Sequence, residues 1–379
     1  MSKSTFLEKL LDGAGAEWVP LQKLVKTLTA AAKIQRGKYE TVGDIPVIDQ
    51  GADFIAGYTD KGNKATELGQ YVIFGDHTEH VKYVDFIFAQ GADGLKILQP
   101  ISSNPKYIYY AFQTFYTKEF QYKRHWSKAK DTEIPIPCPE NPEKSLAIQA
   151  EIVRILDTFT ELTAELTAEL TARKKQYNYY RDQLLTFDLP AGRQVEWTKL
   201  GEIAKIGTGS HDTKDAIDEG DYIFYARGRK PLRLDSYDFD ETAIITAGDG
   251  VGVGKVFHWA EGKYALHQRA YRIVPGDDIE SRYIYHYLIS TFYTYVKKVS
   301  VHASVTSLRK PMFLKLPIPI PPLKEQARIV AILDKFDTLT HSISEGLPRE
   351  IELRQKQCEY YRDLLLNFPK SEPQTEGVA

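Results

Sequence analysis

The chain has 379 residues, of which 26% are charged, and its formal net charge is −2. This length suggests two or three domains with proper hydrophobic cores. The near-neutral charge excludes a uniformly basic nucleic-acid-binding protein, so any such surface must be local. Cys138 and Cys358 are too few and too isolated for a disulfide framework or a zinc site, and no apolar stretch reaches membrane-spanning length.

The chain contains an internal repeat with an offset of roughly 180 residues. Tyr107-Ile108-Tyr109 returns as Tyr283-Ile284-Tyr285, and Ile134-Pro135-Ile136-Pro137 returns as Leu316-Pro317-Ile318-Pro319. Tyr179-Tyr180-Arg181-Asp182 returns as Tyr360-Tyr361-Arg362-Asp363. A tandem duplication of this size predicts a pseudo-twofold axis, so one chain can meet two equivalent partners or two half-sites of one ligand.

In chain order, each half begins with a globular segment, roughly 14–140 and 195–322, and continues into a helical segment, roughly 143–187 and 323–367. Short apolar runs alternate with turn residues in the globular segments and predict strands of a mixed α/β or α+β domain. Examples are Ile45–Ile48, Tyr71–Phe74 and Ala243–Thr246. One helix is predicted in each segment, at about 105–117 and 281–296, with its tyrosine-rich face in the core.

Both helical segments place apolar residues at every third or fourth position and are too long for ordinary globular helices. They predict two arms of an antiparallel coiled coil. Gly346-Leu347-Pro348 predicts a kink or restart in the second arm, because proline removes a backbone donor and clashes with the preceding turn. The opening Phe6–Leu11 resembles Tyr180–Leu185, which suggests that the N-terminal segment closes against the C-terminal end.

Residues 161–172 read Glu-Leu-Thr-Ala three times, which places Leu162, Leu166 and Leu170 on one helix face. Inserting four residues lengthens a helix by about 6 Å and turns it about 40° past a full circle. The segment is therefore either a ruler between two binding domains or a solvated spacer with good helix propensity. The sequence leaves both interpretations open.

Motifs with catalytic appearance do not match their templates. In Gly248–Lys255, Asp249 stands where a phosphate-binding loop needs glycine, and Val256 stands where it needs a hydroxyl. Asp249, Glu261 and Lys263 imitate the loose acid…Glu-x-Lys pattern of metal-dependent nucleases, without a counterpart in the first half. The nine histidines show no ligand spacing, so no metal site is predicted.

Positive charge gathers locally, and two interpretations stay open: DNA contact and solvated surface charge. Lysine and arginine neutralise phosphates, serine and threonine add hydrogen bonds to them, and arginine, glutamine and histidine can also read base edges. The candidate DNA-contacting residues are Lys123, Arg124, His125, Lys128, Lys130, Arg227, Arg229, Lys230, Arg233, Gln268, Arg269, Ser304, Thr306, Ser307, Arg309 and Lys310.

The repeated Pro-Ile-Pro, the Gln-Ala-x-Ile-Val at 149–153 and 326–330, the long helices and the repeated Tyr-Tyr-Arg-Asp together resemble the specificity (S) subunits of type I restriction–modification enzymes. The stretch Leu316–Gln326 is especially typical of that family. The Glu-Leu-Thr-Ala repeats and the opening Phe6–Gly13 resemble its type IC branch. The resemblance covers nearly the whole chain and is strongest in the helical regions.

The resemblance implies an α+β fold with internal pseudo-twofold symmetry, in which two antiparallel coiled-coil helices join two target recognition domains. It places an N-terminal segment and the first recognition domain at 1–142, a central helical region at 143–190, the second domain at 191–322, and a distal helical region with a tail at 323–379. Each domain is then expected to read one half of a split, asymmetric DNA target, and the helices to set the spacer between the halves.

The resemblance also implies a cytoplasmic, non-catalytic subunit that binds double-stranded DNA, two methyltransferase (M) subunits and motor–nuclease (R) subunits. S-adenosylmethionine, ATP and Mg²⁺ are expected on those partners, with no cofactor or metal on this chain and no membrane contact. The alternatives are a metal-dependent endonuclease built on Asp249, Glu261 and Lys263, and a pseudo-dimeric DNA-binding regulator without partners.

Overall fold

The computed structural model describes residues 15–30, 32–62, 65–187, 195–299, 308–342 and 344–369. It divides the chain into two compact units. The first comprises the residues up to Leu166 together with those from Ile351 onward, and the second comprises Thr167–Glu350. The predicted closure by Phe6–Leu11 lies outside the described residues.

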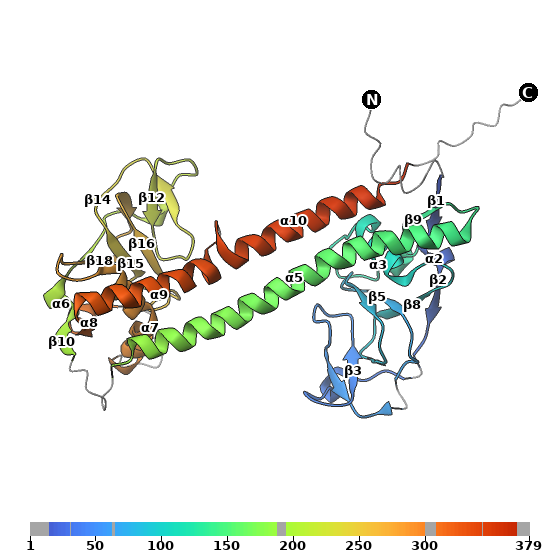
Figure 1. Cartoon of the computed structure of the whole chain (residues 1–379), viewed down its shortest axis with the longest axis horizontal. Helices are drawn as coiled ribbons and strands as arrows, with labels where there is room; N and C mark the ends of the chain where they lie inside the picture. Colours follow the sequence, from blue (N-terminus) through green and yellow to red (C-terminus); the bar gives the residue numbers. More distant parts are fainter. Residues whose placement is uncertain are drawn as a thin grey trace, which may run out of the picture. The chain divides into compact units, whose positions relative to one another are not determined.

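The described part of the first unit is built on two larger sheets and one strand pair (Figure 1). The four-stranded antiparallel sheet has the order β2–β8–β5–β6, and the three-stranded sheet has the order β4–β3–β7, in which β3 and β7 run parallel. The bounds are β1 (Ala16–Pro20), α2 (Leu21–Leu24), β2 (Val25–Leu28), η1 (Arg36–Lys38), β3 (Ile45–Ile48), β4 (Gly57–Thr59), β5 (Tyr71–Gly75), β6 (Val81–Val84), β7 (Ala89–Gln90), β8 (Leu95–Pro100), α3 (Pro105–Phe115), α4 (Trp126–Ala129) and β9 (Glu133–Pro137), which pairs with β1.

The second unit repeats this strand order with β11–β18–β15–β16 and β13–β12–β17–β14, and β12 again runs parallel to β17. The bounds are β10 (Glu196–Lys199), α6 (Leu200–Ile203), β11 (Ala204–Thr208), η3 (Thr213–Asp215), β12 (Tyr222–Tyr225), β13 (Leu232–Leu234), β14 (Phe239–Asp240), β15 (Ala243–Ala247), β16 (Phe257–Ala260), β17 (Lys263–Leu266), β18 (Ala270–Pro275), α7 (Ser281–Val299), α8 (Lys310–Leu314) and β19 (Pro317–Ile320). The α+β class and the predicted strands at 45–48, 71–74 and 243–246 are confirmed.

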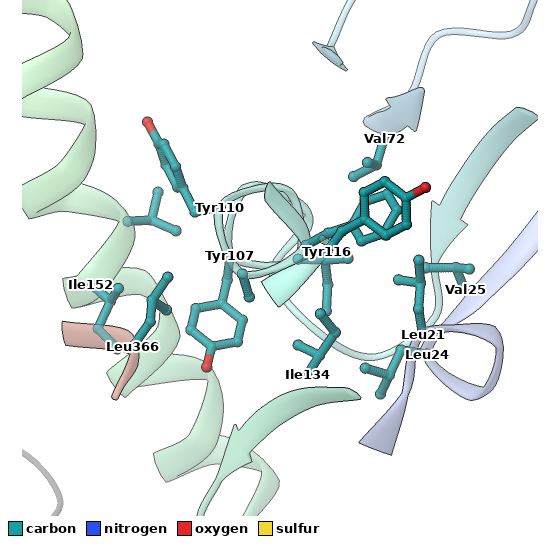
Figure 2. Packing of buried hydrophobic residues seen from close by; sticks show 14 of the residues in the cluster. Leu21, Leu24, Val25, Val72, Tyr107, Tyr110, Tyr116, Ile134, Ile152 and Leu366 are labelled. Carbon is teal, nitrogen blue, oxygen red and sulfur yellow. The ribbon is translucent and has the colours of Figure 1, made fainter. Parts of the chain in front are cut away.

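The core of the first unit forms around helix α3, which contacts β5, β6 and β8. Figure 2 shows Tyr107 of this helix pointing between Ile134 and Leu366, with Val72 of β5 on the helix's other side. Because β5 lies between two strands and beneath α3, all five of its residues are buried. Burying a large apolar side chain contributes about 1.5–3 kcal/mol relative to leaving it exposed. The prediction that the tyrosine-rich helices face the core is confirmed by buried Tyr107 and Tyr283.

The repeated residues hold each globular part together and fix it to its helical arm through matching contacts. The Tyr107 hydroxyl donates to the Pro135 carbonyl at 2.6 Å, and the Tyr283 hydroxyl donates to the Pro319 carbonyl at 2.8 Å. The buried side chains of Gln149 and Gln326 accept from the backbone amides that precede α3 and α7. Ion pairs also match, with Lys106–Asp157 at 2.7 Å and Arg282–Asp334 at 2.6 Å. The sequence repeat is therefore a repeat of joints as well as of strands.

The helical arms are α5 (Pro142–Leu185), α9 (Leu323–His341) and α10 (Gly346–Leu366). Within the first unit, Phe159 of α5 stacks on Tyr361 of α10, and Ile152 lies near Leu366 (Figure 2). Within the second unit, Tyr177 and Tyr180 of α5 contact His341 and Phe336 of α9, respectively. The helices thus run antiparallel in each unit, as predicted.

The predicted restart near Gly346-Leu347-Pro348 is also confirmed, because α9 ends at His341 and α10 begins at Gly346. Gly346 has φ +75°, a left-handed conformation that favours glycine, and a Cβ there would clash with the Thr338 carbonyl. The chain therefore needs glycine at this break as well as the proline that follows.

Candidate nucleic-acid interface

Three loops meet at one edge of the second unit. The parallel strands β12 and β17 bring their carboxyl ends together, and the loop after β15 joins them. The amide of Leu308 donates to the Gly248 carbonyl at 2.7 Å, and the amide of Gly248 donates to the Arg269 carbonyl at 2.8 Å. A Cβ at Gly248 would lie 2.6 Å from that Arg269 oxygen, so the close approach requires glycine.

Asp249 joins basic side chains from two of these loops. Its Oδ1 accepts from Arg227 Nη1 at 2.9 Å, and its Oδ2 accepts from Arg269 Nη1 at 3.0 Å. Arg309 and Lys310 are exposed and directly follow Leu308, which is bonded to the same turn. We call Arg227, Asp249 and Arg269 the Asp249 cluster. The structure thus brings together candidates that are separated by more than 80 residues of sequence, between Arg227 and Arg309.

The charge balance of the Asp249 cluster favours an ionised carboxylate. Burial acts to raise the pKa of Asp249, but the hydrogen bonds and charges of Arg227 and Arg269 outweigh it and lower that pKa. Two arginines share one carboxylate, so the cluster keeps a net positive charge and both guanidinium groups are held in defined directions. Such an arrangement can receive phosphates or base edges without first ordering long side chains.

His267 holds the backbone of Arg269 in this cluster and was not identified from the sequence. Its ring is buried and stacks on Phe224, and its Nδ1 accepts the backbone amide of Arg269 at 2.9 Å. Burial, followed by the charge of Arg227, lowers the pKa of His267, which favours the neutral ring that this hydrogen bond needs. Val251, at the tip of the loop after β15, is 99% exposed and was also not identified. The sequence did carry a signal for Val251, because an apolar residue within a glycine-rich turn is expected to be exposed.

The remaining candidates of the second unit are not members of the Asp249 cluster, or they lie outside the described residues. Arg229 and Lys230 are exposed on the loop after β12. Arg233 of β13 donates to the Gly220 carbonyl at 3.1 Å, and Gln268 donates to Asp212 at 3.0 Å. Ser304, Thr306 and Ser307 lie outside the described residues.

The first unit orders its basic residues around a different carboxylate. Glu79, in the loop after β5, is buried and accepts from the Tyr116 hydroxyl at 2.7 Å and from the amides of Glu119 and Phe120 at 2.8 Å each. Burial acts to raise the pKa of Glu79, but these hydrogen bonds and nearby His125 outweigh it and lower that pKa. Glu79 has φ +56°, a left-handed backbone conformation that is uncommon for a residue other than glycine. No local sequence signal pointed to Glu79.

Glu119 connects that buried carboxylate to the surface charges. It pairs with Lys123 at 2.9 Å and with Lys128 at 3.2 Å, and these lysines lower its pKa to about 2. Arg124 is exposed, and Lys130 is half-buried at the end of α4. Phe120 and Tyr122 are 87% and 92% exposed beside these charges, and Tyr122 stacks on His77.

The prediction that His125 contacts DNA does not fit its position. The side chain is buried, with Nδ1 3.1 Å from Glu119 and Nε2 2.7 Å from the Gln121 carbonyl. The His125 amide donates to the Asp76 carbonyl just as the amide of buried Leu308 donates to Gly248 in the second unit. His125 therefore occupies a core position that precedes the short helix in each domain, and its polar atoms are used internally.

Comparison with known proteins bears on both the fold and this interface. The family model described as "Type I restriction modification DNA specificity domain" matches residues 17–173 and again 193–353. The Escherichia coli type I restriction enzyme EcoR124I/EcoR124II specificity subunit is 41% identical, over 98% of this chain and 99% of that protein. This chain belongs to the type I restriction–modification specificity subunit family.

Two solved structures share the fold of this specificity subunit at 16% sequence identity. A type I restriction–modification S subunit from M. genitalium matches with a TM-score of 0.64, over 95% of this chain and 98% of that one. A chain from a structural study of complex assembly and conformational transition of the type I system matches with a TM-score of 0.55, over 93% and 97%. The IC-like subtype stays a prediction.

The nuclease alternative finds no support in this specificity subunit. Asp249 is held by two arginines, Glu261 accepts from Trp259 Nε1 at 2.7 Å, and Lys263 lies over the Tyr237 ring at 4.6 Å. Among the described residues, no group of three or more His, Cys, Asp or Glu side chains could hold a metal ion. In the same part of the chain, no helix is long and apolar enough to cross a membrane.

The spacer residues lie within one continuous helix. Leu162, Leu166 and Leu170 are half-buried along α5, and the Glu-Leu-Thr-Ala repeats lie inside that unbroken helix. The boundary between the two units falls between Leu166 and Thr167, within the repeats. A change in repeat number would therefore act on the helix without altering either globular domain.

Proposed function

We propose that this chain reads a split, asymmetric DNA sequence, with one globular domain on each half-site. The observation that carries the proposal is the Asp249 cluster, which places preorganised arginines from separate loops at one edge of the second domain. The first domain repeats the fold and presents Arg124, Lys123 and exposed aromatic side chains from the matching segment before α4. Shared scaffolds with different surface chemistry suit two different half-sites.

The helical arms are the proposed docking surface for two methyltransferase subunits, with restriction subunits joining them. The reason is their close repetition, because two similar surfaces on one chain suit two copies of one partner. S-adenosylmethionine, ATP and Mg²⁺ would then be held by those partners in the cytoplasm, and this chain would contribute recognition without catalysis. Recognition by a subunit that leaves base flipping and methyl transfer to its partner needs no catalytic side chains of its own.

The experiment is adenine-methylation mapping in cells that express the full chain with its methyltransferase partner. A single two-part motif, with each half altered by substitutions in one domain only, is the expected result. Methylation without a sequence motif would overturn the proposal. Co-purification with two methyltransferase copies separates a specificity subunit from a partner-free regulator, and metal-dependent cleavage by the chain alone, lost in Lys263→Ala, would favour the nuclease.

A further inference from the structure

A buried lysine of the first domain holds the loop between β3 and β4. Lys82 is the second residue of β6, is the cross-strand partner of Ile73 in β5, and is 7% exposed. Its Nζ donates to the carbonyls of Asp49 and Asp53 at 2.9 Å and 2.5 Å. Both acceptors belong to loop 49–56, so one side chain fixes two points of that loop.

A histidine of the second domain contacts the corresponding loop. His258 is the second residue of β16 and is the cross-strand partner of Ile245 in β15. Ile245 is the third residue of β15, just as Ile73 is the third residue of β5. Its Nε2 lies 2.9 Å from the Gly228 carbonyl, in loop 226–231 between β12 and β13. Its ring also packs on Tyr225, the last residue of β12.

The two loops occupy one place in the repeated fold. Each follows the strand that runs parallel to β7 or β17, and each leads into the antiparallel neighbour of that strand. Gly51 and Gly228 both stand three residues after the strand's last residue. The lysine and the histidine therefore hold the same loop of the repeated fold, through different carbonyls and with different chemistry.

Packing alone does not explain a polar side chain at this position. A buried ammonium group, and to a lesser degree a half-buried imidazole, costs free energy unless its hydrogen bonds are made, and an apolar residue on the same strand would pack without that cost. Burial lowers the pKa of Lys82 and of His258. What the two side chains share is the capture of a loop carbonyl across the sheet edge.

We propose that Lys82 and His258 are equivalent positioning residues, each holding one loop in the conformation that reads its own DNA half-site. The inference rests on the proposed function. In the second domain the held loop carries Arg227, Arg229 and Lys230, and in the first it carries the half-exposed Phe54. A loop fixed before binding loses less conformational freedom on DNA, so its contacts discriminate bases more sharply.

The test is selection of bound sequences from a randomised duplex library by the full chain with its methyltransferase partner. Lys82→Met and His258→Phe remove the donors and keep most of the side-chain volume, and Lys26→Met, at an exposed position of β2, is the matched control. Each variant is expected to lose about tenfold discrimination in one half-motif, a different half for each, since one good base contact discriminates by about that much. Lys82→Arg and His258→Gln, which restore a donor, should recover it.

The results that would contradict the proposed function are different from those that would contradict the positioning role of Lys82 and His258. A wild-type complex that selects no split motif would contradict the proposed function itself. A wild-type split motif with unchanged halves in His258→Phe, equal blurring of both halves, or no recovery by the donor-restoring variants would overturn the positioning role. If Lys82→Met does not fold, as judged by thermal unfolding, the half-buried His258 pair of variants still decides.

Discussion

In the second domain, Arg227 and Arg269 extend from separate loops around one half-buried carboxylate, whereas the first domain has Gln50 and Asp93 in the matching loops. Gln50 follows β3 at the place where Arg227 follows β12, but its amide is used internally, by the amide of His77 and the Asp93 carbonyl. The first domain instead gathers its positive charge before α4, around Glu79 and Glu119. One scaffold thus supports two different charge layouts.

The difference teaches where specificity can change without loss of fold. The joints that involve Gln149 and Gln326 or Tyr107 and Tyr283 are repeated, so they cannot distinguish one half-site from the other. The loops at the ends of the parallel strands differ, with Arg227 and Arg269 in one domain and Gln50 and Asp93 in the other. Substitutions in those loops should therefore alter one half-site and leave the helical arms unaffected.

The largest effect is expected from a deletion in α5 that changes the distance between the two domains and leaves each domain's own sequence preference unchanged. Deleting Thr167–Leu170 removes one Glu-Leu-Thr-Ala-length step from α5, which is about 6 Å of helix. Both half-motifs should persist while their separation shortens by about one to two base pairs, at about 3.4 Å per pair. Affinity for the original site should fall on the order of 100-fold or more, because only one half can then be contacted in register.

The measurement is the spacer length in motifs selected or methylated by the deletion variant. An Ala168→Ser variant, which changes the same helix without changing its length, is the control. Unchanged spacing in the deletion variant would refute the ruler and favour a solvated spacer.

The second test disrupts the hydrogen bonds to Glu79 in the first domain and leaves the second domain unchanged. Glu79→Gln removes the charge that receives three hydrogen bonds in the interior, which should cost about 3 kcal/mol of local stability. The amides of Glu119 and Phe120 should exchange with solvent faster, and only one half-motif should blur. Hydrogen exchange of the full chain measures this, with exposed Glu67→Gln as the control.

The same carboxylate predicts a direction for pH. The folded pKa of Glu79 is depressed, so its stabilisation is fully present above the unfolded value of about 4.3 and is lost as pH falls below that value through the folded pKa. The 119–120 amides should therefore lose protection at acid pH in the wild type. Glu79→Gln should show a weaker acid dependence there, and equal dependence in both proteins would exclude Glu79 as the group responsible.

The features of this fold that could be predicted are those encoded by short-range sequence patterns. The apolar runs at 45–48, 71–74 and 243–246, the helix periodicity and the break at Gly346-Leu347-Pro348 are short-range signals, and the structure follows them. The Asp249 cluster was not predictable as a cluster, because Arg227 and Arg269 meet only through the parallel pairing of β12 with β17. His125 appeared within a basic run, yet the docking of α4 buries it where the other domain has Leu308.

A smaller effect is expected from removing one arginine of the second domain. Arg227→Ala should weaken specific DNA binding about 5- to 30-fold, since a lost base or phosphate contact of this kind costs about 1–2 kcal/mol. Arg309→Ala should act in the same direction, and co-purification with the methyltransferase subunit should be unchanged for both. Arg233→Ala is the matched comparison, because that guanidinium is bonded to the Gly220 carbonyl outside the cluster. Loss of assembly in Arg227→Ala would assign the residue a structural role.

The smallest expected effect tests whether Asp249 restrains the arginines or merely neutralises them. Asp249→Asn removes the charge that pairs Arg227 with Arg269, and a partly exposed pair of this kind is worth about 0.2–1 kcal/mol. Binding to non-specific duplex DNA should rise about two- to fivefold and become more salt-dependent, while discrimination in one half-motif falls, because the freed guanidinium groups meet phosphates without a fixed direction. Asp235→Asn removes the same charge from an exposed position and should leave discrimination unchanged. A gain in non-specific binding without any loss of discrimination would mean that Asp249 only reduces the local charge, and that the two arginines find their orientation on the DNA itself.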